Sequence, residues 1–304
     1  GSAMKWEFAY DSPKAITQLL GEREYAMTKK FGQNFLLSTS IRQKIVTLLS
    51  LEAGQRVLEI GPGIGSITTL LLDTGVDLTA FEIDRGFCQI LREEAFGEHP
   101  RFTLVEGDAL KTLFAHLKRS PTPDRICGNL PYNVGTILVA RLLESEYRPP
   151  LMVFTLQKEV ADRLGAAEGS KEWAALSLLA QADYDIVTAA TIAPSSFYPP
   201  PKVESSVVRF TLREESRVPE HLRDAFSIIR GDLFAQRRKT ILNNVRSGKS
   251  GAILGKEGVA TLFQESGIDP GKRAEVLGWE DFLALSAALY TYRATRSGDT
   301  RRDK

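Results

Sequence analysis

Four consecutive residues, Asn129-Leu130-Pro131-Tyr132, carry the most specific chemistry in the sequence. They follow a stretch typical of a strand, residues 125–127, and precede a helical pattern. The Asn129 side chain offers one carbonyl acceptor, the backbone carbonyl of Leu130 offers a second, and the Tyr132 ring can stack on a flat base. Methylation of an adenine amino group needs these three elements. A proline turn at the end of a strand is the simpler interpretation, and the motif alone does not exclude it.

A glycine-rich turn lies about seventy residues upstream of this motif. The apolar stretch Val57 to Ile60 is typical of a buried parallel strand, and Gly61-Pro62-Gly63-Ile64-Gly65 follows it, before a helical pattern. Strand, glycine turn and helix form the first unit of a doubly wound nucleotide-binding sheet. Pro62 removes an N–H that could bind a pyrophosphate, which favours a nucleoside ligand over NAD. A glycine-rich loop by itself is weak evidence.

Two carboxylates stand where the next strands should end. Glu82 follows a second strand pattern about twenty residues after the first glycine, where a carboxylate can accept both hydroxyls of a ribose. Asp108 closes a third strand pattern and can accept from an adenine amino group. Each acid could instead be a solvated loop carboxylate, and solvation or helix capping suits Asp84 and Glu106 better. Adenosine held by Glu82 and Asp108, with a methionine moiety over the glycine loop, predicts S-adenosylmethionine as the ligand.

The composition fits a globular protein. The chain has 304 residues, 43% of them hydrophobic, which is enough for a full core and a second small domain. There is no run of about eighteen apolar residues and no visible secretory signal, so we expect a cytoplasmic protein without membrane contact. The two cysteines and three histidines lack metal-ligand spacing, and we therefore expect no metal.

The net charge of +1 conceals clusters of basic residues. Residues 28–44 include Lys29 and Lys30 and contain no acid. A second cluster is Arg237-Arg238-Lys239, and further arginines follow residue 292. Runs of charge are usually solvated surface, but basic clusters in a chain with an adenine-amine motif favour a phosphate-binding surface.

Strand and helix patterns alternate after the glycine turn, as a parallel sheet requires, and only helical patterns follow residue 214. We expect an N-terminal extension over residues 1–27, a sheet domain over 28–214 and a helical domain over 215–304. Near the end of the sheet domain, Phe197-Tyr198-Pro199-Pro200-Pro201-Lys202 is a loop stiffened by its prolines. Its adjacent aromatic residues suit base stacking, although plugging the sheet is an equal alternative.

Taken together and in this order, the motifs closely resemble those of the small-subunit ribosomal RNA adenine N6,N6-dimethyltransferases. Each motif alone is weak, whereas the ordered set, over residues 25–290, is highly specific. The matching segments are 31–36, 59–63, 82–84, 107–109, 128–133, 156–160, 197–203, 236–240, 267–268 and 273–275. Two positions depart from the family pattern: Trp173-Ala174-Ala175 replaces Tyr-Gly-Arg, and Gly135 replaces a common Ser.

The resemblance implies an α/β fold, in which a doubly wound, Rossmann-like S-adenosylmethionine-dependent methyltransferase sheet carries a small C-terminal all-helical domain. It implies dimethylation of two adjacent adenosines near the 3′ end of small-subunit rRNA, in a pre-30S-type particle, by a monomer whose action is coupled to ribosome assembly. By matched position the donor-binding residues are Asn34, Leu36, Gly61, Glu82, Asp108 and Asn129, to which we add Gly63. The predicted catalytic residues are Asn129, Leu130, Pro131 and Tyr132. The predicted RNA-binding residues are Lys29, Lys30, Phe197, Lys202, Arg237, Arg238 and Lys239.

Three other activities remain as alternatives. A large-subunit rRNA dimethyltransferase of the macrolide-resistance type is disfavoured by the loop at residues 197–202 and the long helical domain. A DNA adenine methyltransferase would usually show a different motif order or a target-recognition insert. A non-catalytic ribosome-assembly factor would keep the fold without turnover, and the intact motif at residues 129–132 argues against it.

Overall fold

The computed structural model describes residues 6–22 and 33–302, with side chains as far as residue 297. The chain forms two compact units, each built from more than one stretch of sequence. The first contains residues 1–161 and 185–212, and the second contains 162–184 and 213–304.

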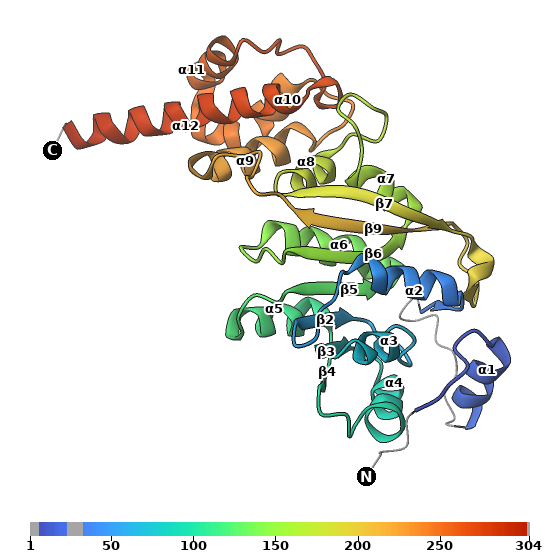
Figure 1. Cartoon of the computed structure of the whole chain (residues 1–304). Helices are drawn as coiled ribbons and strands as arrows, with labels where there is room; N and C mark the ends of the chain where they lie inside the picture. The colour runs from blue at the N-terminus through green and yellow to red at the C-terminus, as the bar shows by residue number, and fades with distance from the viewer. Residues whose placement is uncertain (1–5, 23–32, 303–304) are drawn as a thin grey trace. The chain divides into compact units, whose positions relative to one another are not determined.

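A seven-stranded sheet organises the first unit (Figure 1). Its strands, in spatial order, are β4 (Phe102–Glu106), β3 (Asp77–Glu82), β2 (Arg56–Ile60), β5 (Arg125–Asn129), β6 (Leu151–Gln157), β9 (Ser205–Leu212) and β7 (Tyr184–Ile192). Neighbours from β4 to β6 run parallel, and β9 runs antiparallel to β6. The doubly wound sheet expected from the sequence is therefore confirmed.

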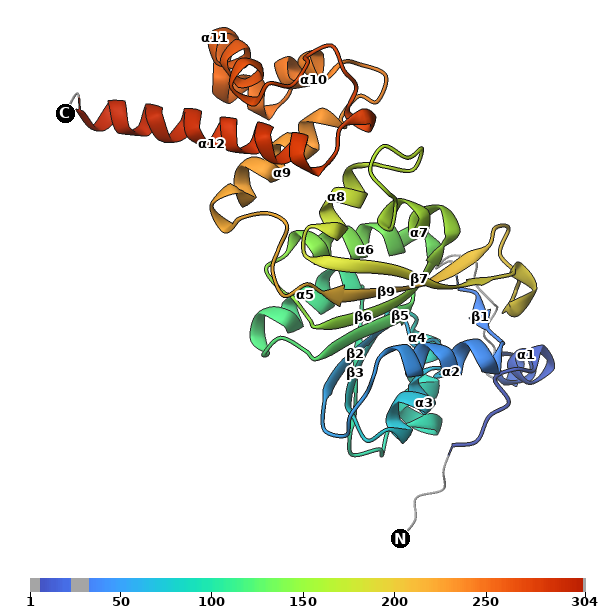
Figure 2. The ribbon, with the colours of Figure 1, turned by 45° about the horizontal axis from the view of Figure 1, so that its top comes forward.

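Helices cover both faces of this sheet because its central strands are apolar on both sides. In β2, Val57, Leu58 and Ile60 are all buried. Helices α2 (Thr39–Leu48) and α3 (Thr68–Asp73) cover one face, and α5 (Ala109–Arg119) and α6 (Tyr132–Glu144) cover the other (Figure 2). Helix α4 (Arg85–Ile90) continues into a π-helical turn, Leu91–Ala95.

The described N-terminal residues, 6–22, pack within the first unit and not as a separate extension. Its helix α1 (Pro13–Glu22) buries Ile16 and Leu20 in a cluster with Phe35 and Phe87. Two short strands, β1 (Phe35–Leu36) and β8 (Phe197–Tyr198), form an antiparallel pair beside the main sheet. A 3-10 turn, Pro194–Ser196, leads into β8.

Helices build the second unit around their own apolar core. They are α8 (Ala175–Gln181), α9 (Arg223–Leu233), α10 (Ile241–Ser247), α11 (Lys249–Ser266) and α12 (Trp279–Arg302), with 3-10 turns at Glu220–Leu222 and Ala274–Val276. Helix α11 is kinked at Gly255, which adopts a φ of 68°. The short helix α7 (Lys158–Leu164) begins in the first unit and ends in the second.

The second unit also includes residues 162–184, which the sequence pattern assigns to the sheet domain. Trp173 is fully buried, and its Nε1 donates to the Leu277 carbonyl at 2.8 Å. Trp173 and Leu178 pack into the same core as Phe226 and Phe282. The sequence pattern did not reveal this because a short helical segment between two strands has the same periodicity whichever core it joins. Among the described helices, none combines the length and apolarity needed to cross a membrane.

Candidate functional site

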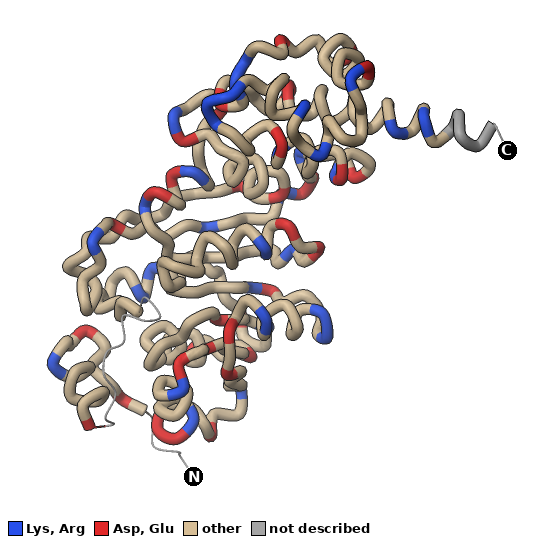
Figure 3. The backbone as a smooth tube through the Cα atoms, turned by 180° about the vertical axis from the view of Figure 1, so that it is seen from behind, with Lys and Arg blue, Asp and Glu red and all other residues tan. Residues whose placement is uncertain are grey.

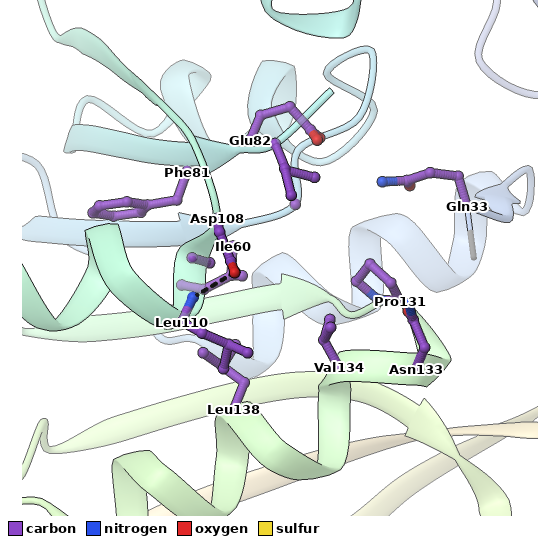
Figure 4. Close-up of a pocket in the computed structure, with 13 residues that line it drawn as sticks. Gln33, Ile60, Phe81, Glu82, Asp108, Leu110, Pro131, Asn133, Val134 and Leu138 are labelled. Carbon is purple, nitrogen blue, oxygen red and sulfur yellow. Dashed lines mark hydrogen bonds between the residues drawn. The ribbon is translucent and has the colours of Figure 1, made fainter. Parts of the chain in front are cut away.

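The predicted site residues meet where the parallel strands end. Strands β2, β3 and β5 are paired in register, so the positions that follow their last residues lie side by side. A cleft opens at this edge (Figure 4). It is lined by Gln33, Ile60, Gly61, Phe81, Glu82, Ile83, Asp108, Ala109, Leu110, Pro131, Asn133, Val134 and Leu138. A mostly apolar cleft with a few polar groups is typical of a small-molecule site.

Glu82 is the most buried acid in the cleft, with 1% of its surface exposed. Its Oε1 accepts from the Gly63 N–H at 2.9 Å, and its Oε2 accepts from the Asp84 N–H at 3.0 Å. Burial raises the pKa of Glu82 to about 7, although the N–H groups of Asp84 and Gly63 act against that rise. Each carboxylate oxygen keeps a second lone pair, so Glu82 can still accept from a ligand hydroxyl.

The glycine loop has the conformation that only glycine adopts readily. Gly61 and Gly63 have φ values of 70° and 60°. The Gly61 N–H donates to the Phe81 carbonyl at 2.8 Å, and a Cβ at Gly61 would lie 3.6 Å from the Asn129 carbonyl. The loop therefore passes close to strand β3, which carries Glu82, and to the Asn129 motif.

Asp108 follows strand β4 and caps helix α5. Its Oδ1 accepts from the Leu110 N–H at 3.0 Å, drawn as the dashed line in Figure 4. The side chain is half-buried and lines the cleft, which leaves its second oxygen as an acceptor for a ligand. Asp84 caps helix α4 through the Phe87 N–H at 2.9 Å, as expected from its position. Glu106 lies 3.7 Å from Arg92 at the surface.

Asn129 is the last residue of β5, and its amide is oriented by the N-terminal strand. Its Nδ2 donates to the Asn34 carbonyl at 3.1 Å. Asn34 in turn donates through Nδ2 to the Pro199 carbonyl at 2.6 Å. With Nδ2 engaged in this way, Oδ1 of Asn129 is the atom left to accept a hydrogen bond, as the adenine-amine hypothesis requires.

The rest of the motif begins helix α6. Pro131 precedes the first helical residue and lines the cleft, while the Leu130 side chain is buried. The Tyr132 hydroxyl makes a short hydrogen bond with the Ser205 hydroxyl on β9. This bond anchors the far end of the phenol, and burial raises the pKa of Tyr132. A Cβ added at Gly135 would lie 3.2 Å from the Leu156 side chain, which leaves little room for the Ser common at this position in the family.

One predicted residue faces a different way from the one expected. Phe197, proposed to stack on RNA bases, is only 2% exposed and packs in the core that includes Leu36. Its pairing with Leu36 in the β1–β8 ladder directs the ring inward, so this prediction is corrected. The Leu36 side chain is also buried, so Leu36 can contact the methyl donor only through its backbone.

The basic residues show a mixed picture, and Figure 3 shows how Lys and Arg are distributed over the chain. Lys29 and Lys30 lie outside the described residues. Lys202 is exposed, as are Arg237, Arg238 and Lys239 in the loop between α9 and α10. Arg237 is partly engaged, because it donates to the Lys171 carbonyl at 3.1 Å and lies 3.8 Å from Glu275.

Sequence reasoning missed a buried residue that fixes this basic loop. Asn244 on α10 is 1% exposed. Its Oδ1 accepts from the Gln236 N–H at 3.1 Å, and its Nδ2 donates at 3.0 Å to the carbonyls of Leu233 and Gln236. A polar residue at an apolar helix position was the available signal.

The apolar walls of the cleft were missed as well. Ile83 follows Glu82 directly and is 39% exposed, and Val134 faces the same space from α6 (Figure 4). Gln33 points into it from the N-terminal side (Figure 4). An apolar residue placed just beyond a strand end was the signal for Ile83, since such a position is normally polar.

Comparison with known proteins decides the family. A family model described as "Ribosomal RNA adenine dimethylase" matches residues 25–290. The chain belongs to this family. It is therefore an S-adenosylmethionine-dependent methyltransferase of ribosomal RNA. A protein of Treponema denticola named "Ribosomal RNA small subunit methyltransferase A" is 40% identical over 279 residues, which cover 91% of this chain and 94% of the relative. A protein of the same name from Geobacter sulfurreducens is 38% identical, over 86% of this chain and 94% of the relative.

Solved structures support the fold. A dimethyladenosine transferase from Plasmodium falciparum has a TM-score of 0.68 at 23% identity and covers 82% of this chain and 94% of its own. The 23S rRNA methyltransferase ErmE has a TM-score of 0.62 at 23% identity, with 84% and 99% covered. At these identities the likeness shows the fold alone. Within the described part of the chain, no three His, Cys, Asp or Glu side chains gather as metal ligands would.

Proposed function

We propose that this protein dimethylates two adjacent adenosines near the 3′ end of small-subunit rRNA. The observation that carries the proposal is the oriented Asn129 amide, whose Nδ2 is engaged by Asn34 and whose Oδ1 is left to accept from an amine. The small-subunit names of the relatives, at 40% and 38% identity, support the substrate assignment over the large subunit.

The residues that line the cleft match the donor–acceptor chemistry of the methyl donor. Glu82 can accept from the ribose hydroxyls, Asp108 can accept from the adenine amino group, and the apolar side chains of Ile83 and Val134 can contact the purine faces. Gly61 and Gly63, which carry no side chain and have positive φ, let the methionine moiety approach the backbone of the loop. When bound, the sulfonium supplies an electrophilic methyl group.

The role of the Asn129 motif follows from the chemistry of an aromatic amine. The lone pair of the adenine amino nitrogen is delocalised into the ring, so the nitrogen is a poor nucleophile. Hydrogen bonds from its two hydrogens to the Asn129 Oδ1 and the Leu130 carbonyl favour a pyramidal nitrogen whose lone pair is available for in-line attack. The catalytic contribution is therefore positioning and electrostatics, and no strong base is needed.

Recognition of the RNA needs a surface outside the cleft, because one adenine pocket cannot select a single site in a large RNA. Exposed Arg238 and Lys239 lie in a loop whose backbone is fixed by Asn244. Phosphate contacts from such residues set register, while the cleft reads the base. A pre-ribosomal small-subunit particle acted on by a monomer is the form of substrate and enzyme that we propose.

The catalytic proposal is tested by methyl transfer from labelled S-adenosylmethionine to undermethylated small-subunit particles, with large-subunit particles as the second substrate. We expect transfer to small subunits only, and its loss in Asn129→Ala while binding to the particle and cooperative melting persist. Transfer to large subunits, or wild-type turnover by Asn129→Ala, would overturn the assignment of substrate or of site.

The RNA surface is tested with two double variants that each remove two exposed positive charges. Arg238→Gln with Lys239→Gln alters the basic loop, and Lys118→Gln with Arg119→Gln alters the end of α5 as a control. Each lost phosphate contact lowers the slope of log affinity against log salt by about one. Only the first variant should show this loss. Equal slopes would identify the loop as ordinary solvated surface.

A further inference from the structure

The glycine loop is held from behind by residues that the proposed function does not use. Its front carries the Gly63 N–H that donates to Glu82. On the other side, the Tyr10 hydroxyl donates to the Ile64 carbonyl at 2.9 Å. Tyr10 belongs to the N-terminal segment and is only 4% exposed.

Arg42 on helix α2 makes a second contact of the same kind. Its Nη2 and Nε both donate to the Ser66 carbonyl, at 2.6 and 3.1 Å. Arg42 is 6% exposed, and its guanidinium carbon lies 5.0 Å from the centre of the Tyr10 ring. Ile64 and Ser66 flank Gly65, so Tyr10 and Arg42 fix the backbone on both sides of the last glycine.

The hydrogen bonds also fix the direction of the Tyr10 hydroxyl. Trp6 Nε1 donates to the Tyr10 oxygen at 2.7 Å, and this leaves the Tyr10 proton for the Ile64 carbonyl. Burial raises the pKa of Tyr10, so the phenol stays protonated and remains a donor.

Side chains also pack tightly against the loop at Gly65. A Cβ at Gly65, which has a φ of 99°, would lie 2.5 Å from the Phe96 ring and 3.0 Å from the Tyr10 oxygen. The Ile64 side chain is buried in the cluster that contains Ile16 and Leu20 of α1. The loop is therefore packed directly against Tyr10, Phe96 and helix α1.

We propose that Tyr10 and Arg42 are positioning residues for the methyl donor, which act through the carbonyls of Ile64 and Ser66 on the loop that carries Gly63. This inference rests on the proposed donor site. A loop carbonyl that loses its partner turns to water, and the loop then populates conformations that do not bind the donor. The apparent affinity falls by the fraction of binding-competent loop that is lost.

Tyr10→Phe tests the first contact, because it removes one hydroxyl and leaves the ring in place. Tyr292→Phe is its matched control, since the Tyr292 hydroxyl donates to the Leu254 carbonyl at the same 2.9 Å in the helical unit. Both variants should lose a similar amount of thermal stability. Only Tyr10→Phe should weaken binding of S-adenosylmethionine in calorimetry, by about threefold to tenfold, which is the effect of one hydrogen bond.

Arg42→Lys tests the second contact while keeping the charge. Its matched control is Arg125→Lys, because Arg125 donates to the Leu49 carbonyl at 2.6 Å and the Ser50 carbonyl at 3.1 Å, remote from the cleft. Arg42→Lys should raise the donor KM several-fold and leave kcat at saturating donor unchanged. Hydrogen exchange at residues 61–67 should become faster in Arg42→Lys and Tyr10→Phe alone.

The outcomes separate this inference from the proposed function. Failure of the wild-type protein to bind S-adenosylmethionine would refute the donor site itself. Wild-type binding with equal donor affinity in each test variant and its control would refute the positioning role. If Tyr10→Phe loses cooperative melting, the comparison of Arg42→Lys with Arg125→Lys decides the question.

Discussion

Donor binding should depend on pH through the ionisation of one buried carboxyl. Burial raises the pKa of Glu82 from 4.5 to about 7. Only the ionised group offers all its lone pairs to two ribose hydroxyls, so the donor binds the carboxylate form in preference. Lowering the pH below 7 should therefore weaken donor binding, and raising the pH above 7 should bring the donor affinity to a plateau.

The size of the effect follows from the pKa. At pH 6 about a tenth of Glu82 is ionised, so the Kd should be roughly tenfold higher than its plateau value, a change of about 1.4 kcal/mol. Each further pH unit downward adds about the same amount. Donor binding near pH 6.5 should also release a proton, because it selects the carboxylate.

Calorimetry with S-adenosylmethionine between pH 5.5 and 7.5, in buffers of different ionisation enthalpy, measures both quantities. Glu82→Gln should bind more weakly at every pH, with no slope in this range. Asp108→Asn is the matched control, because it weakens binding but keeps Glu82 and therefore the slope. A wild-type Kd that is flat over this range would show that the protonation state of Glu82 does not govern donor binding.

Three further changes have expected outcomes. Glu59→Gln should raise the melting temperature at pH 8 but not at pH 4, because burial raises the pKa of Glu59 from 4.5 to about 8. Between these two pKa values the native state binds more protons than the unfolded state, so the stability of the wild-type protein falls as the pH rises from 4.5 to 8. Asn244→Ala should lower stability by about 1–3 kcal/mol and weaken small-subunit particle binding without changing donor affinity in calorimetry. Gly65→Ala should lower the melting temperature more than Gly54→Ala, because both have positive φ but only the first would place a Cβ against Phe96.

The sequence predicted the sheet and the edge where the site lies, because both depend on local signals. Buried strands give apolar runs, and the residues after them are placed at one edge by parallel pairing. Gly61, Glu82 and Asp108 were found in this way, and the structure brings all three to the cleft. The Asn129 motif was found by its donor and acceptor chemistry.

The remainder depends on contacts between segments that are distant in sequence. Phe197 has the same local pattern whether its ring faces RNA or the core, and pairing with Leu36 decides for the core. The contribution of Tyr10 to the glycine loop spans 54 positions and has no periodic signature. Asn244 and the membership of residues 162–184 in the helical unit likewise follow from tertiary packing.

The divided helical unit also constrains the order in which the chain can fold as it is synthesised. Residues 162–183 leave the ribosome before β7 and β9 complete the sheet, and before the helices that cover Trp173 exist. For that interval a segment rich in apolar side chains has no native partner, which is the condition that favours aggregation or chaperone capture. A stop codon after Leu212 would make this condition permanent. A soluble sheet unit therefore requires removal of residues 162–183, which precede β7, together with the C-terminal helices.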